Sequence, residues 1–162
     1  MSLSARRWLE LWQRLGAPRS ADGTLADEFV ALKKCYDEKH RHYHGTQHIG
    51  ECLAHFDSAR TLCEHADEVE LALWFHDAIY ELRAKDNEAQ SAAWAERVMR
   101  VAGISGAVKQ RVHALIMKTC HDSWCSRINS SRLEELPTSM STPCRTKSPR
   151  SSITCRQSAD SK

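Results

Sequence analysis

Hydrophobic residues recur at helical spacing over residues 8–116 of this 162-residue chain. In the first such segment the positions i, i+3, i+4 and i+7 are all apolar, namely Trp8, Leu11, Trp12 and Leu15. This spacing places the four side chains on one face of an α-helix. The same pattern predicts five further helices, around residues 25–36, 49–56, 69–75, 92–101 and 108–116.

Residues that favour helix ends lie at the borders of these segments. Gly16 and Pro18 should end the first helix, and Gly103 should end the fifth, because neither residue type favours a helix interior. Thr24 is expected to be the N-cap of the second helix. The third helix should begin near residues 45–46, where a glycine is followed by a threonine.

The segment at residues 69–75 is almost continuously apolar. A helix with this composition should be buried on most of its faces. No stretch of residues 1–122 alternates apolar and polar residues with a period of two, so no sheet is predicted. The expected fold class is therefore all-α.

The composition divides the chain into two unlike parts. Residues 1–122 hold all nine histidines, 16 Lys and Arg and 18 Asp and Glu, for a net charge of −2, whereas residues 123–162 hold 7 Lys and Arg and 3 Asp and Glu, for +4. The second part is rich in serine, threonine and proline, and its few large apolar residues follow no sustained period. Such a segment cannot bury enough surface to offset its ordering entropy. We expect a helical domain over residues 1–122 and a disordered tail over residues 123–162.

Charge and hydropathy argue against several classes of protein. No run of 18 apolar residues is present, so no membrane span is expected, and residues 1–13 are too polar for a secretory signal, which predicts a cytoplasmic protein. The net charge of +2 favours no nucleic-acid partner, and a charge of +4 spread over the tail is weak support for one. The seven cysteines are scattered without a Cys-x-x-Cys pair and are expected to be reduced thiols.

Three polar clusters interrupt the predicted helices, at residues 40–49, 74–80 and 86–92. Each has an ordinary structural interpretation. Lone histidines such as His55 and His113 are usually satisfied core residues, and acidic residues at a helix start complement the helix dipole. A His-Asp dipeptide is also common by itself. Only the combination of the three clusters indicates a metal-binding or catalytic site.

The pair His76-Asp77 ends the most hydrophobic helix, where an uncompensated buried carboxylate would cost several kcal/mol. A metal ion coordinated by both side chains would remove that cost. His48 lies 28 residues upstream and can join them if the two helices pack side by side. Imidazole and carboxylate ligands suit divalent Mn, Fe, Co, Ni, Zn or Mg.

His48 followed by the adjacent pair His76-Asp77 on a helical frame resembles the HD-domain superfamily of metal-dependent phosphohydrolases. The segments 41–49, 71–80 and 87–92 are similar to a small bacterial branch of predicted HD phosphohydrolases, and the resemblance covers about residues 6–122. The Tyr-His-x-x-x-His arrangement ending at His48 is also similar to that of cyclic-nucleotide phosphodiesterases, in which the first histidine donates a proton and the second binds metal. An HD-domain helical bundle is the fold that the resemblance implies.

The resemblance also implies roles for individual residues. The metal ligands would be His48, His76 and Asp77. His44 would be the general acid that protonates the leaving oxygen, or a hydrogen-bond donor to a phosphate oxygen. Glu88 would be a general base or an outer-shell residue. The residues expected to contact the substrate are Arg41, Asn87 and His121. For Arg41, a solvated position on the surface is an equal alternative. For His121, the alternative is that it binds a second metal ion.

The sequence departs from the family after residue 122. HD enzymes complete the metal site with a second aspartate on a later helix, but no aspartate follows Asp122 until Asp160. The Ser, Arg, Thr, Pro and Cys content of the tail is typical of an out-of-frame reading of GC-rich DNA. One hypothesis is therefore a frameshift or alternative C-terminus that leaves the bundle truncated. A natural disordered tail, and Asp122 as a substitute ligand, are the alternatives.

Two functional hypotheses follow from these residues. The first is an enzyme that hydrolyses a phosphate ester of a nucleotide or related small metabolite through metal-activated water, impaired if the fourth ligand is missing. The second is a non-catalytic HD-like module that binds a nucleotide or a protein partner. The sequence selects neither the substrate nor the metal.

Overall fold

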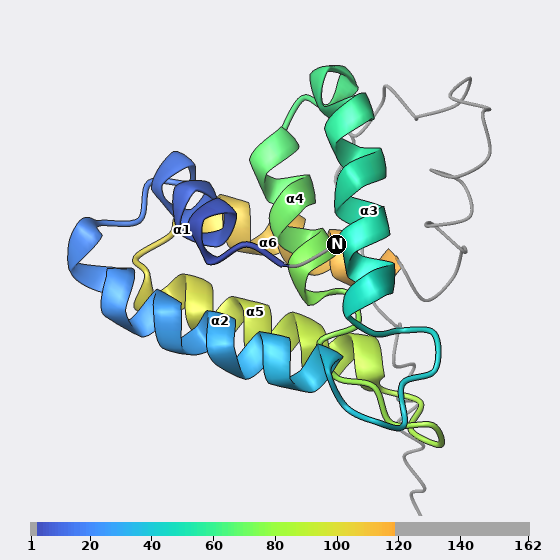
Figure 1. Cartoon of the computed structure of the whole chain (residues 1–162). Helices are drawn as coiled ribbons and strands as arrows, with labels where there is room; N and C mark the ends of the chain where they lie inside the picture. Colours follow the sequence, from blue (N-terminus) through green and yellow to red (C-terminus); the bar gives the residue numbers. More distant parts are fainter. Residues whose placement is uncertain (1–2, 119–162) are drawn as a thin grey trace, which may run out of the picture.

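The computed structural model describes residues 3–118 of the chain, and its regular secondary structure in that range is helical. Within residues 3–118 the chain forms six α-helices, with short 3₁₀ turns at 19–21 and 60–62 (Figure 1). Their bounds are α1 Ala5–Arg14, α2 Asp22–Tyr36, α3 Thr46–Ala59, α4 Ala66–Phe75, α5 Asn87–Val101 and α6 Gly106–Lys118. No strand occurs between residues 3 and 118, so the prediction of an all-α fold is confirmed.

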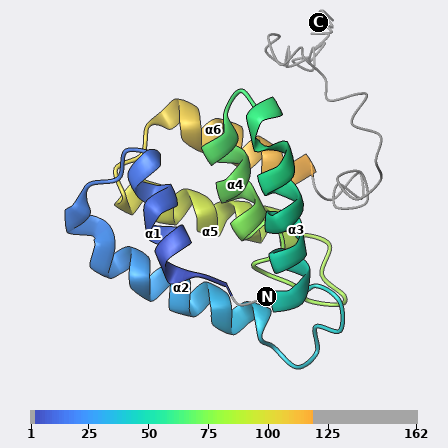
Figure 2. The same ribbon diagram turned by 45° about the horizontal axis from the view of Figure 1, so that its top comes forward.

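Helix α4 lies at the centre of the domain. It packs against α1, α3, α5 and α6, so neighbours surround it on several sides. The five residues 71–75 are each 0% exposed, as the continuous apolar run predicted. Helices α3 and α4 lie side by side, and α6 passes across α4 on another side (Figures 1 and 2).

An aromatic cluster joins α1, α2 and α4 around Trp8. The Trp8 ring lies edge-on to Trp12 and to Trp74, with centroid distances of 5.4 Å in both pairs. Its indole N–H donates to the Leu25 carbonyl oxygen at 2.7 Å, which satisfies the polar atom of a fully buried ring. Edge-on aromatic pairs add about 0.5–1.5 kcal/mol each to the burial of their apolar surface. This cluster fixes α1 against the second half of α4.

The observed helix ends agree with the sequence at both predicted glycines. Gly16 and Gly103 follow α1 and α5 with φ of 91° and 71°, the left-handed region that glycine adopts without strain. The expectation for Thr24 was wrong, because α2 already begins at Asp22. The 3₁₀ turn at 19–21 runs directly into α2, so its first residues are helical before Thr24 is reached.

Two loops that carry the predicted polar clusters meet at one end of the domain. The loop over residues 37–45 joins α2 to α3, and the loop over 76–86 joins α4 to α5. Both lie at the same end in two views (Figures 1 and 2). His40 Nε2 lies 3.0 Å from the carbonyl oxygen of Tyr80, a contact that joins the two loops.

A buried carboxylate ties α1 to α4. Glu70 on α4 is 1% exposed, and its oxygens accept from the guanidinium groups of Arg7 at 2.7 Å, Arg14 at 2.8 Å and Arg60. The arginines are partly exposed, so water can still reach them. This cluster joins α4 to α1 and to the 3₁₀ turn at 60–62 through ion pairs.

Replacing Glu70 by alanine should lower the free energy of unfolding by about 1–3 kcal/mol, because three cationic donors lose their shared acceptor. The value stays below the cost of breaking a fully buried pair because the arginines can be hydrated. Thermal unfolding followed by circular dichroism measures the change. Glu10→Ala, which removes only an exposed pair with Arg6, is the matched control and should leave the transition nearly unchanged.

No helix between residues 3 and 118 is long and apolar enough to cross a membrane. Three predictions concern residues outside the described range. They are the domain border at residue 122, the disorder of residues 123–162 and the use of Asp122 as a substitute ligand.

Candidate metal centre

The end of α4 presents His76 and Asp77 to the two loops. His76 is the C-cap of α4 and is buried, and its Nδ1 lies 2.8 Å from the carbonyl oxygen of Leu73. Since a carbonyl only accepts, Nδ1 carries the hydrogen in this contact. His76 Nε2 is therefore directed to the other side of the ring, and in the neutral tautomer it would offer its lone pair to a metal ion, which is how metal-binding histidines are commonly fixed.

His44 and His48 approach from the start of α3. His48 lies in the first turn of α3 and is buried, whereas His44 precedes the helix with a side chain that is 33% exposed. Gly45 lies between His44 and the start of α3, and a Cβ at this position would lie 3.2 Å from the carbonyl oxygen of Tyr36. A larger residue at position 45 would thus push the start of α3 away from α2.

Asp77 Oδ2 lies at the meeting point of three imidazole rings. It is 2.7 Å from His44 Nδ1, 3.1 Å from His76 Nε2 and 3.7 Å from His48 Nε2. The structure therefore brings together four residues that the sequence analysis selected, from positions up to 33 residues apart.

The surroundings of Asp77 keep its carboxylate ionised. Burial raises the pKa of Asp77, but hydrogen bonds from His44 and His76 and the charges of these rings outweigh burial and hold the pKa well below its usual range. An ionised carboxylate is the form that binds a cation.

The distances in this cluster distinguish spacings that would suit a shared metal ion from a direct hydrogen bond. Ligand atoms about 2.0–2.2 Å from one ion, at tetrahedral angles, lie roughly 3.3–3.6 Å apart. The spacings of Asp77 Oδ2 to His76 Nε2 and to His48 Nε2, 3.1 and 3.7 Å, are close to this range. The 2.7 Å between Asp77 and His44 is a hydrogen-bond length, so His44 fits a donor to the carboxylate better than a ligand.

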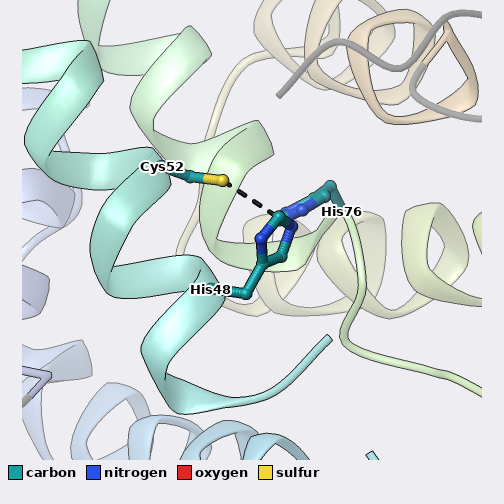
Figure 3. A group of neighbouring side chains, drawn as sticks. All are labelled: His48, Cys52 and His76. Atoms are coloured by element: carbon teal, nitrogen blue, oxygen red, sulfur yellow. Dashed lines mark hydrogen bonds between the residues drawn. The ribbon is translucent and has the colours of Figure 1, made fainter. Parts of the chain in front are cut away.

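One residue near the centre was missed at the sequence level. Cys52 Sγ lies 3.7 Å from His48 Nε2, and the ligand atoms of His48, Cys52 and His76 are all within 4.8 Å of one another (Figure 3). A second group with the same spacing is His44, His48 and Asp77. The signal in the sequence was the spacing of four between His48 and Cys52, which places both on one face of a helix.

Arg41 lies beneath the centre rather than at its surface. Its side chain is 1% exposed, and it donates to the Asp77 and Ala78 carbonyl oxygens as well as to Glu38. The guanidinium also lies 5.4 Å from the Tyr36 ring centroid and 5.6 Å from that of Tyr80. Arg41 therefore joins the two loops and fixes the backbone of Asp77. The solvated surface position considered for it was wrong, and contact with a substrate phosphate stays a prediction.

Replacing Arg41 by alanine should weaken metal binding by roughly 10–100-fold, the usual cost of losing a residue that orients a ligand. The carbonyl oxygens of Asp77 and Ala78 lose their donor, so the end of α4 is no longer fixed against the loop. Metal titration of the folded variant measures the effect. Arg83→Ala, an exposed arginine in the other loop, is the matched control. If Arg41→Ala and Arg83→Ala bind the metal with equal affinity, Arg41 does not position the metal centre.

The remaining predicted residues lie around the centre or beyond the described range. Asn87 accepts from the Glu81 N–H and donates to the Glu81 carbonyl oxygen, so its amide holds the loop to α5. Glu88 is half-buried in the first turn of α5, and within residues 3–118 no hydrogen bond or ion pair joins it to Asp77. His121 lies outside the described residues.

The core positions expected for His55 and His113 were wrong. Both side chains are exposed, because each occupies the outer face of an amphipathic helix. A histidine in an apolar stretch is thus not by itself evidence for burial in this chain.

No protein family, curated protein or solved structure matches the chain. The resemblance to the HD-domain superfamily therefore rests on the motifs of the sequence.

Proposed function

We propose that the chain is a metal-dependent phosphohydrolase of the HD type, with a divalent ion held by His48, His76 and Asp77. The observation that carries the proposal is the convergence of three imidazole rings on one ionised carboxylate where two loops meet. An ion bound there supplies Lewis-acid chemistry and lowers the pKa of water, which permits attack on phosphorus at neutral pH. Imidazole and carboxylate donors fit such an ion.

His44 has the geometry of a proton donor beside this centre. Its Nδ1–H donates to Asp77 Oδ2 at 2.7 Å, so a proton for the leaving oxygen would be carried at Nε2. The partial exposure of the His44 side chain gives a substrate access to it. Asp77 thus holds both the ion and the orientation of the acid.

Aromatic rings beside His44 support a nucleotide-like substrate. Tyr43 is 68% exposed, and its ring centroid lies 5.3 Å from that of His44. The centroid of the partly buried Tyr80 ring lies 4.6 Å from that of His44. An exposed ring such as that of Tyr43, next to a phosphate-binding centre, can stack on a planar base, which contributes about 1–3 kcal/mol per base. Four further residues are proposed to contribute to the site, namely Glu88, Asn87, Arg41 and His121. The proposed location of the protein is the cytoplasm.

The experiment is an assay of the full chain with a phosphodiester, a phosphomonoester and a set of nucleotides. Each substrate is tested after a chelator and after return of Mn, Fe, Co, Ni, Zn or Mg. We expect hydrolysis that disappears with the chelator and returns with at least one ion. His76→Ala should be inactive, whereas His55→Ala, an exposed histidine of α3, should keep full activity. Metal and nucleotide binding without hydrolysis would instead favour a non-catalytic module.

A further inference from the structure

Cys52 lies on the same face of α3 as His48, one helical turn further along. This face is turned toward the end of α4, where His76 lies opposite both side chains (Figure 3). Cys52 is 3% exposed, and His48 and His76 are also buried. The sulfur is therefore enclosed together with two imidazole nitrogens rather than with apolar side chains alone.

The spacing of this group fits a thiophilic ion. Zinc–sulfur and zinc–nitrogen bonds of about 2.3 and 2.0–2.1 Å at a tetrahedral angle place the two ligand atoms roughly 3.6 Å apart. The observed distance from Cys52 Sγ to His48 Nε2 is 3.7 Å. His76 is already oriented for ligation by its hydrogen bond to Leu73, and Asp77 lies beside both imidazoles.

The other described cysteines lack this arrangement. Burial raises the pKa of both the Cys35 and the Cys63 thiols, and neither belongs to a group of metal-ligating side chains within residues 3–118. A buried cysteine is ordinarily a small apolar residue. Its place between two histidines at ligand spacing distinguishes Cys52 from that ordinary case.

We propose that Cys52 is a protein ligand of the metal centre, beside His48, His76 and Asp77, and that the centre takes Zn²⁺ or Co²⁺ in preference to Mg²⁺ or Mn²⁺. This inference rests on the proposed metal centre and adds a thiolate to it. Thiolate ligands favour soft ions, whereas Mg²⁺ and Mn²⁺ prefer oxygen.

Cobalt absorption tests the sulfur ligand directly. Co²⁺ is titrated into the metal-free full chain, and the near-ultraviolet thiolate-to-cobalt band is recorded for the unchanged protein, Cys52→Ser, Cys35→Ser and Cys63→Ser. We expect the band in all but Cys52→Ser. That variant should still bind Co²⁺, but more weakly. Loss of an outer-shell residue lowers metal affinity by roughly 10–100-fold, and loss of a direct ligand should lower it by at least as much.

The outcomes separate this inference from the proposed function. Bound Co²⁺ without the band, or a band that persists in Cys52→Ser, overturns the role of Cys52 and leaves the metal centre standing. Failure of the chain to bind Co²⁺ or Zn²⁺ overturns both. X-ray absorption of the unchanged, zinc-loaded chain gives a readout that needs no variant to fold. A sulfur neighbour at about 2.3 Å is expected, and a shell of nitrogen and oxygen alone contradicts the proposal.

Discussion

Replacing Asp77 by alanine should remove most of the metal from the protein. The carboxylate is the one oxygen ligand within the described cluster, and it lies beside all three imidazoles. Its loss removes a negative charge and the acceptor of His44 together. We expect affinity to fall by more than the roughly 10–100-fold cost of losing an outer-shell residue.

Metal content after dialysis against a trace of the ion measures this change. Asp77→Asn has nearly the same shape and separates the charge from the packing, and it should lose metal almost as fully. Asp57→Ala on α3 is the control, since this residue pairs with Arg7 far from the cluster. Full occupancy in Asp77→Ala would show that the ion is bound elsewhere.

Replacing His44 by alanine should leave the metal in place and lower turnover by roughly 10²–10⁴, the usual contribution of a positioned acid or base. The 2.7 Å contact with Asp77 is a hydrogen bond, so the ion keeps its ligands when His44 is removed. Turnover of a phosphodiester and metal content, measured on the same sample, provide the comparison.

The leaving group distinguishes an acid from a structural histidine. A substrate whose leaving oxygen needs no protonation, such as a nitrophenyl ester, should be much less affected by His44→Ala than an alkyl ester. His42→Ala is the control, because this exposed histidine lies in the same loop. Equal losses on both esters, or unchanged turnover on both, would remove His44 from the proposed mechanism.

The helical frame was predictable because it depends on local patterns. The spacing of Trp8, Leu11 and Trp12 and the glycines at 16 and 103 located helices and their ends without tertiary information. Thr24 failed as a start signal because the preceding 3₁₀ turn already nucleates α2. A side-chain cap is one way to start a helix, and a continuous backbone turn is another.

The candidate site was predictable only in part. His44, His48, His76 and Asp77 were found because their combination is unusual, and the structure brings them within hydrogen-bond or ligand spacing. Cys52 was hidden because cysteine also counts as an apolar core residue, so its position fitted the helix pattern without calling for chemistry. The burial of Arg41 could not be foreseen, because it depends on the meeting of two loops distant in sequence.

The most direct test of the metal centre is a crystal structure of the full chain soaked with Zn²⁺, with the ion located by its anomalous scattering. The predicted result is one ion about 2.0–2.2 Å from His48 Nε2, His76 Nε2 and Asp77 Oδ2. An anomalous peak on surface residues such as His55 alone, with none between α3 and the end of α4, would contradict the assignment.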